Sequence, residues 1–197
     1  QIALDFQTSK IAGCLLTHEH DDHSHSIRDV LKAGISVYTS KGTQEALGIN
    51  HHRIKTIEAR KQFKIGSFTI LPFETEHDAN EPLGFLIESD AGERLLFATD
   101  TYFIRYRFER LNIIAVECNY SEEILRQNIL DGIVPVVTKR RLVQSHFSFE
   151  NYKEFLRAND LSHVREIWLI HMSNRNADAD LFKREIQQLT GKPVYIA

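Results

Sequence analysis

The sequence predicts an α/β fold for this chain of 197 residues. Short apolar segments typical of strands alternate with segments of helical periodicity, and the middle of the chain is rich in strand patterns. In addition, side chains that can bind a metal follow several of the predicted strands directly. The length fits one compact domain over residues 1–197, large enough to bury a core.

The first half of the chain alternates strand and helix patterns before it becomes β-rich. We expect strands at 11–16 and 35–39, helices at 24–34 and 41–47, a β-segment at 61–75 that turns at Gly66, and a hairpin at 84–100 that turns at 90–92. Gly34 and Gly48 are placed to end the two helices, and Ser40 is placed to cap the second one.

The second half of the chain continues the alternation. We expect strands at 112–118, 164–171 and 193–197, and helices at 121–129, 149–158 and 178–190, with Ser148 opening the second of these helices. No repeat or low-complexity tract marks an internal linker. This order of elements favours α/β layers over one simple parallel sheet.

The composition is that of an ordinary soluble globular protein, with 42% hydrophobic and 26% charged residues and a net charge of −3. No apolar run approaches the roughly 20 residues that span a bilayer, so we expect no membrane contact. The N-terminal residues lack the pattern of a signal peptide. Cys14 and Cys118 lie in apolar runs and are expected to be reduced, buried thiols, which favours a cytoplasmic location.

Histidine and aspartate side chains gather where predicted strands end. They are His18, His20, Asp22 and His23 after the first strand, then His77, Asp100 and His171 after three later ones. Side chains two residues apart in an extended backbone point to the same side. His18 and His20 are therefore expected to face the same ligand. Neutral imidazoles and carboxylates that converge from several rigid elements are metal ligands. The alternatives are a histidine-rich surface loop and a degenerate, purely structural metal site.

Two further residues, Glu117 and His146, carry groups suited to acid–base chemistry. Glu117 ends a predicted buried strand, where an unpaired carboxylate would be costly, and His146 lies just before a predicted helix. A histidine oriented by a glutamate can act as a general acid on an alkoxide leaving group. The alternative is that both residues are surface groups near helix starts.

The motif THEHDDH, followed by His77, Asp100 and His171 in that order, resembles the metallo-β-lactamase superfamily. The resemblance implies an αββα sandwich with a dinuclear metal centre. One ion would be held by His18, His20 and His77, and the second by Asp22, His23 and His171, with Asp100 bridging them. The strands that usually precede the first histidine of this fold are expected to be missing from the given residues. Two divalent ions, zinc or manganese, fit these donors.

Further segments, among them HDANEPLGFLIE, VECNYSEEIL and LIHMSNRN, resemble the YycJ (WalJ) group of nucleases in this superfamily. This resemblance implies 5′-to-3′ exonuclease action, with DNA favoured over RNA as the substrate. It assigns catalytic roles to Asp22, Glu117 and His146. It places Lys139, Arg140, Arg141, Ser148 and Arg175 at the substrate backbone.

Three other functions remain open for the same residues. A small phosphodiester such as a cyclic nucleotide would use the same metals and the same histidine. Hydrolysis of a lactone or thioester would use the metals but would have no need for Glu117, His146 and the Lys-Arg-Arg run together. A non-catalytic, metal-stabilised binding module would bind metal without turnover. Assembly into a homo-oligomer is open as well.

Overall fold

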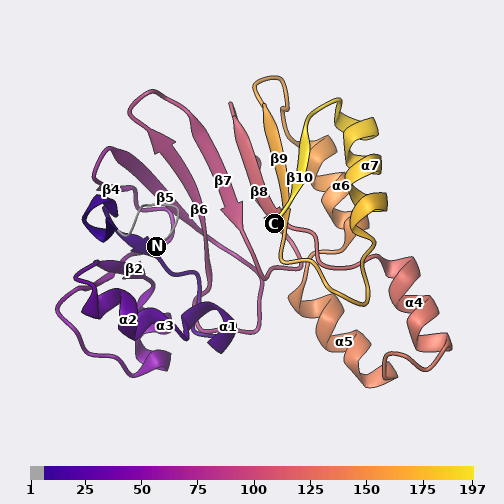
Figure 1. The fold of residues 1–197 in the computed structure, drawn as a ribbon, viewed down its shortest axis with the longest axis horizontal. Coiled ribbons are helices and arrows are strands. Elements are labelled where there is room, and N and C mark those ends of the chain that lie inside the picture. The colour runs from indigo at the N-terminus through magenta and orange to yellow at the C-terminus, as the bar shows by residue number, and fades with distance from the viewer. Residues whose placement is uncertain (1–6) are drawn as a thin grey trace. The chain divides into compact units, whose positions relative to one another are not determined.

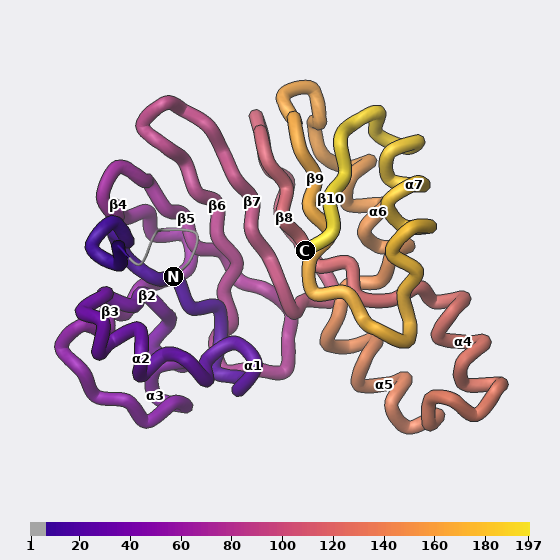
Figure 2. The backbone as a smooth tube through the Cα atoms, in the orientation of Figure 1, coloured from indigo at the N-terminus to yellow at the C-terminus, as the bar shows by residue number. Residues whose placement is uncertain are grey.

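The structure is a computed structural model that describes residues 7–197. The chain divides into two compact units. The N-terminal unit runs up to Glu74 and includes Ala79–Asp90, and the C-terminal unit consists of Thr75–Asp78 and Ala91–Ala197. Figure 1 labels most helices and strands of both units, and Figure 2 follows the backbone through them. The expectation of one domain over residues 1–197 stays a prediction.

The N-terminal unit contains one parallel and one antiparallel set of strands. Strands β1, β2 and β3 are parallel, whereas β4, β5 and β6 are antiparallel neighbours in chain order. The bounds are β1 Cys14–Leu15, α1 Asp21–Ser24, α2 Ile27–Lys32, β2 Val37–Thr39, α3 Lys41–Leu47, β3 Ile54–Thr56, β4 Phe63–Ile65, β5 Phe68–Glu74 and β6 Leu83–Ser89. The strand patterns of this half therefore predicted most of its elements.

The core of the N-terminal unit forms where α2 packs against the parallel strands. Its buried apolar side chains are Leu16, Ile27, Leu31, Val37, Ile49 and Ile54. The helix predicted at 24–34 is interrupted, since α1 ends at Ser24 and α2 begins at Ile27. The prediction for α3 is confirmed: Ser40 accepts a hydrogen bond from the backbone N–H of Thr43, and Gly48 has a φ of 61°.

A close approach between neighbouring strands makes Gly84 the most constrained glycine of this unit. Gly84 on β6 pairs with Phe73 on β5, and a Cβ at Gly84 would lie 2.4 Å from Cζ of Phe73. We expect Gly84→Ala to lower the free energy of unfolding by about 2 kcal/mol, because overpacking forces buried side chains from their rotamers. Urea unfolding followed by circular dichroism measures this loss.

The background of Phe73→Leu provides the control for Gly84→Ala. Leucine has no ring at the clash position, so the cost of the alanine should fall to less than half in that background. An equal cost of Gly84→Ala in both backgrounds would show that the contact between residues 73 and 84 does not cause the destabilisation.

The C-terminal unit is built on a parallel sheet with the strand order β10-β9-β8-β7. Its bounds are β7 Arg94–Ala98, β8 Ile113–Glu117, α4 Glu122–Leu130, α5 Val136–Ser145, α6 Phe149–Ala158, β9 Glu166–Ile170, α7 Ala179–Thr190 and β10 Val194–Ile196. Because the strands are parallel, their carboxyl ends meet at one edge of the sheet. Residues that follow β7, β8 and β9 therefore lie near one another.

Helices α6 and α7 pack against each other beside the strands of this sheet (Figure 1). Their contact is centred on the rings of Phe149 and Phe182, which are stacked with centroids 4.1 Å apart and are both buried. The helix predicted at 149–158 is confirmed with these bounds, and the one predicted at 178–190 begins one residue later, after the capping Asp178. Capping residues explain this agreement.

Helix α5, strand β3 and a 3-10 helix at Thr8–Lys10 were not predicted. Helix α5 contains the sequence VVTKRRLVQS, in which β-branched residues with low helix propensity occupy the first turn. Strand β3 has three residues, and two of them are exposed, so it has no apolar run to reveal it. Helix α5 and strand β3 depend on neighbours distant in the sequence rather than on a local pattern.

The two cysteines are not joined by a disulfide. Cys14 and Cys118 are free thiols; Cys118 is buried and Cys14 is half-buried, and burial raises the pKa of both. Among residues 7–197, none of the helices combines the length and the apolar character that a bilayer crossing needs.

Candidate functional site

Three strand ends of the C-terminal unit bring together acidic and imidazole side chains. Asp100 follows β7, Glu117 is the last residue of β8, and His171 follows β9. His146 joins them as the residue after α5. The nitrogen and carboxylate oxygen atoms that these four side chains offer to a ligand lie within 4.8 Å of one another. Parallel strand polarity therefore places this cluster at the carboxyl edge of the sheet.

Glu117 is the centre of this cluster, and its side chain is fully buried. The ring N–H groups at Nδ1 of His146 and His171 donate to its Oε1 atom, over 2.6 and 2.9 Å. The backbone N–H groups of Thr101 and Phe147 donate to Oε2, over 3.0 and 3.3 Å. Four donors thus compensate the carboxylate for the loss of water, which explains how it can be buried.

Asp100 and His171 have unusual backbone conformations as well as a direct interaction. Their φ angles are 48° and 54°, in the left-handed region that non-glycine residues rarely adopt but that Asp, Asn and His tolerate best. Nδ1 of His171 lies 2.8 Å from Oδ1 of Asp100. Hydrogen bonds to Asp100 first and Glu117 second raise the pKa of His171 to about 10, although desolvation acts in the opposite direction.

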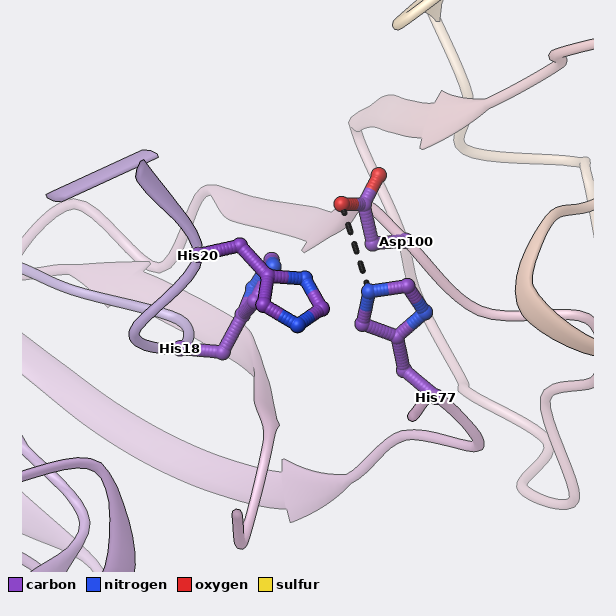
Figure 3. A group of neighbouring side chains, drawn as sticks. All are labelled: His18, His20, His77 and Asp100. Carbon is purple, nitrogen blue, oxygen red and sulfur yellow. Dashed lines mark ion pairs between the residues drawn. The ribbon is translucent and has the colours of Figure 1, made fainter. Parts of the chain in front are cut away.

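His77 is oriented through its Nδ1 atom. This atom donates to the backbone carbonyl of Ser145 over 3.0 Å, so the other ring nitrogen, Nε2, is directed to Asp100. Nε2 lies 3.5 Å from Oδ2 of Asp100, the contact drawn as a dashed line in Figure 3. Both side chains are almost fully buried. A histidine held at Nδ1 by a carbonyl presents Nε2 to a metal in many metalloproteins.

The N-terminal unit carries a separate group of histidines in and after the turn that follows β1. The ring of His18 is 4.8 Å from that of His20 and 4.4 Å from that of His23, measured between centroids. Figure 3 labels the first two of these side chains. Nε2 of His23 lies 3.6 Å from Oδ2 of Asp22. Nδ1 of His18 is held by the hydroxyl of Thr17, over 3.0 Å, which leaves Nε2 as the ligand atom.

The turn that carries these histidines is fixed within its own unit. Oε1 of Glu19 accepts two hydrogen bonds from Asn80, from the backbone N–H over 2.8 Å and from the side-chain amide over 2.9 Å. The hydroxyl of Ser24 donates to the carbonyl of Glu19 over 2.8 Å. His25 is exposed. These contacts give the ligand-type residues a rigid support.

The donor sets of both units fit a divalent transition metal. Each set combines imidazole nitrogens with carboxylate oxygens and contains no thiolate, a combination that suits zinc and manganese. In both units one ring nitrogen of a histidine is held by an oxygen atom of the protein, which orients the other. The assignment of these residues to two shared ions stays a prediction, since the sets belong to different units.

The predicted basic residues lie on the surface of the C-terminal unit. Lys139, Arg140 and Arg141 are exposed on α5, five to seven residues before His146. Nε of Arg141 lies 3.7 Å from Oδ2 of Asp78, the residue after His77. The side chain of Arg175 is also exposed, in the segment that follows β9.

Ser148 is a correction to the predicted set of substrate-binding residues. Its side chain is fully buried, and its hydroxyl accepts a hydrogen bond from the backbone N–H of Asn151 over 3.1 Å. Ser148 is therefore the N-cap of α6 and is placed away from substrate by burial. Its position two residues after His146 does not give it access to solvent.

Several residues that support the site were not predicted. The backbone N–H of Thr101 binds Glu117, the carbonyl of Ser145 binds His77, and the side-chain amide of Asn119 donates to the carbonyl of His171 over 2.7 Å. Two of the three act through the backbone, which no residue type reveals. Only the position of Thr101, directly after Asp100, could have indicated its role.

The C-terminal unit has a parallel sheet with histidine and carboxylate side chains at its carboxyl edge. These features are those of an α/β protein whose strand ends can bind a metal. Comparison with known families makes this specific: the model described as "Beta-lactamase superfamily domain" matches residues 3–172. The chain therefore belongs to this family. A UPF0173 protein of Pyrococcus abyssi is 25% identical over 173 residues, which cover 82% of this chain and 78% of that protein.

Solved structures show the same fold. The metallo-β-lactamase fold protein YhfI from Bacillus subtilis matches with a TM-score of 0.70 at 16% identity, covering 99% of this chain and 79% of YhfI. Igni18, a metallo hydrolase from Ignicoccus hospitalis, matches with a TM-score of 0.67 at 14% identity, over 93% and 74%. A diphosphatase from the PhnP family gives 0.64 at 14% identity, over 95% and 68%. The predicted α/β metallo-β-lactamase fold is confirmed, and the expectation about preceding strands stays a prediction.

Proposed function

We propose that this protein is a metal-dependent phosphodiester hydrolase whose substrate is nucleic acid, with DNA favoured over RNA. The observation that carries the proposal is the 2.6 Å hydrogen bond between Nδ1 of His146 and the buried carboxylate of Glu117, beside Asp100 and His171. Hydrolysis of a lactone or thioester would have no need for this pair together with the exposed Lys-Arg-Arg run of α5. The resemblance of several segments to the YycJ group supports a nuclease of the exonucleolytic type.

Each side chain has a defined part in this proposal. Glu117 holds the His146 ring by Nδ1, so Nε2 is the nitrogen available to give a proton to the leaving oxygen. Divalent ions, zinc or manganese, would supply Lewis-acid chemistry when bound: they lower the pKa of a water and neutralise charge on the phosphoryl oxygens. We assign His18, His20 and His77 to one ion.

The second ion would be held by Asp22, His23 and His171, with Asp100 shared between the two. Asp22 would then be a catalytic residue as well as a ligand of the second ion. The exposed cations of α5, together with Arg175, would bind phosphate oxygens of the substrate backbone. A protein of the same fold is named a diphosphatase, and this name supports a substrate with a phosphorus centre.

Replacement of His146 tests the proposed function directly. We expect His146→Ala to lower the rate of cleavage of 5′-phosphorylated linear duplex DNA by about 10²-fold, because the leaving oxygen loses its proton donor. The metal content, measured by mass spectrometry after metal loading, should stay unchanged. The matched control is His163→Ala, which removes an exposed histidine outside the site and should leave the rate as it is. Normal cleavage by the His146 variant would contradict the proposal.

Salt dependence separates a polymer from a small phosphodiester as the substrate. Cleavage of DNA that is held through several phosphates should slow steeply between low and physiological salt, since bound counterions are released on binding. Turnover of a cyclic nucleotide, which makes one phosphate contact, should change little. We therefore expect a steep salt dependence of kcat/KM for duplex and single-stranded DNA and no EDTA-sensitive turnover of cyclic nucleotides. The reverse pattern would favour the small phosphodiester.

A further inference from the structure

A cavity of about 350 Å³ lies in the C-terminal unit, and Phe147, the residue after His146, is one of its lining residues. Loop 103–107 and helix α6 line it, and Phe147 and Phe155 contribute buried aromatic surface. Its volume is in the range of small-molecule binding sites.

The walls of this cavity are attached to the carboxylate that orients the predicted general acid. Phe147 donates its backbone N–H to Oε2 of Glu117, and Thr101 donates its own N–H to the same oxygen. The hydroxyl of Thr101 in turn donates to the carbonyl of Phe103 over 2.8 Å. One buried carboxylate therefore fixes His146, one aromatic wall and the start of the loop that forms the other wall.

The lining residues combine flat apolar surface with polar and cationic groups. The side chains of Phe103 and Arg107 are exposed, and the Phe103 side chain is 52% accessible. Arg107 makes no ion pair within the described residues 7–197, whereas the guanidinium of Arg105 is paired with Glu76. The side-chain amide of Asn151 donates to the carbonyl of Tyr102 over 3.4 Å, which leaves its oxygen as an acceptor at the cavity.

We propose that this cavity is a nucleoside subsite, which receives the base and sugar of the nucleotide next to the scissile phosphate. Aromatic side chains stack on any nucleobase because every base has a π-face, and Phe103 is the exposed ring that can do so. Arg107 attracts a flanking phosphate, and the amide oxygen of Asn151 accepts from an amino group of the base. The proposal rests on the proposed function and names the part of the substrate that is bound.

The subsite explains how a terminal nucleotide can be positioned without sequence specificity. Stacking on an aromatic ring tolerates all bases, and the shared attachment to Glu117 keeps the stacked nucleoside at a constant distance from His146. The expected consequence is a preference for substrates that carry a base at this position over substrates that carry only the sugar and phosphate.

Binding to the metal-free protein tests the subsite independently of catalysis. In EDTA we expect adenosine 5′-monophosphate to bind at least tenfold more tightly than ribose 5-phosphate, as measured by ligand-observed NMR titration. Phe103→Ala should weaken the binding of the nucleotide by about tenfold and leave the sugar phosphate unchanged. Phe68→Ala is the matched control, because it removes an exposed aromatic ring of similar accessibility in the N-terminal unit.

Three outcomes would contradict the proposed subsite: equal affinity of the two ligands, no binding of the nucleotide, or unchanged nucleotide binding by Phe103→Ala. Cleavage assays separate this result from the proposed function. On DNA with a normal terminal nucleotide the Phe103 variant should lose about tenfold in kcat/KM, and on DNA with an abasic terminal residue it should match the wild type. If the Phe103 variant cleaved both DNA substrates like the wild type, the protein would be a hydrolase that lacks this subsite. Nucleotide binding without any EDTA-sensitive cleavage would leave the subsite without the hydrolase.

Discussion

Asp100→Asn should abolish nearly all phosphodiester hydrolysis and leave the fold intact. Asparagine has the same shape and tolerates the φ of 48° at this position, so the backbone has no reason to change. The amide has no negative charge to share between metal ions and to hold His77 and His171, whose nitrogens lie 3.5 and 2.8 Å from the carboxylate. We expect a fall in kcat/KM of at least about 10³-fold, equivalent to about 4 kcal/mol.

The measurement compares the cleavage of duplex DNA, the metal content and the circular dichroism spectrum of the variant and the wild type. Asp90→Asn makes the same chemical change on an exposed residue in the turn after β6 and should have no effect on any of the three. Near-normal cleavage of DNA by Asp100→Asn would contradict the proposal that Asp100 is shared between the metal ions.

Glu117→Ala should cause the largest loss of stability of any single replacement in the site. Alanine removes the acceptor of four donors, the buried backbone N–H groups of Thr101 and Phe147 and the half-buried ring N–H groups of His146 and His171. Of these, His171 keeps Asp100 as a partner, over 2.8 Å. We expect the free energy of unfolding to fall by about 4 kcal/mol, since unsatisfied buried donors retain their desolvation cost. The melting temperature should drop by about 10 °C.

Denaturation in EDTA, followed by circular dichroism, measures this loss without a contribution from metal binding. Glu117→Gln should lose less than the alanine variant, because the amide oxygen still accepts from part of the donor set. Glu109→Ala is the matched control on an exposed loop residue and should change stability by less than about 0.5 kcal/mol. Equal losses at 117 and 109 would show that the buried carboxylate does not stabilise the fold.

The parts of the fold that could be predicted from the sequence are those with a local physical cause. Helix α6 begins after a capping serine, and α3 ends at a left-handed glycine, so both have the predicted bounds. Helix α5 could not be predicted, because its β-branched first turn has low helix propensity and its amphipathic pattern is weak. The short exposed strand β3 depends on pairing with β2, which is a non-local interaction.

The site shows the same division between local and non-local information. Residue type and position after a strand were sufficient to group Asp100 and His171 in one predicted metal centre. The structure adds Glu117 to these two, because the parallel strands end at one edge. That one carboxylate oxygen is shared by two histidines depends on side-chain geometry, and the capping role of Ser148 depends on burial. Neither property is visible in the residue types alone.

The left-handed backbone at Asp100 and His171 affects how evolutionary change at these positions should be interpreted. A residue there must satisfy the backbone before any chemistry is considered, and this requirement alone disfavours valine, isoleucine and threonine. A descendant without the activity would still favour aspartate, asparagine, histidine or glycine at both positions. The persistence of aspartate and histidine at these two positions among relatives would therefore measure backbone constraint as well as activity. The φ of His77 is not positive, so the backbone does not restrict the residue type there. Substitution of His77 among relatives would therefore indicate more directly whether the activity has been kept.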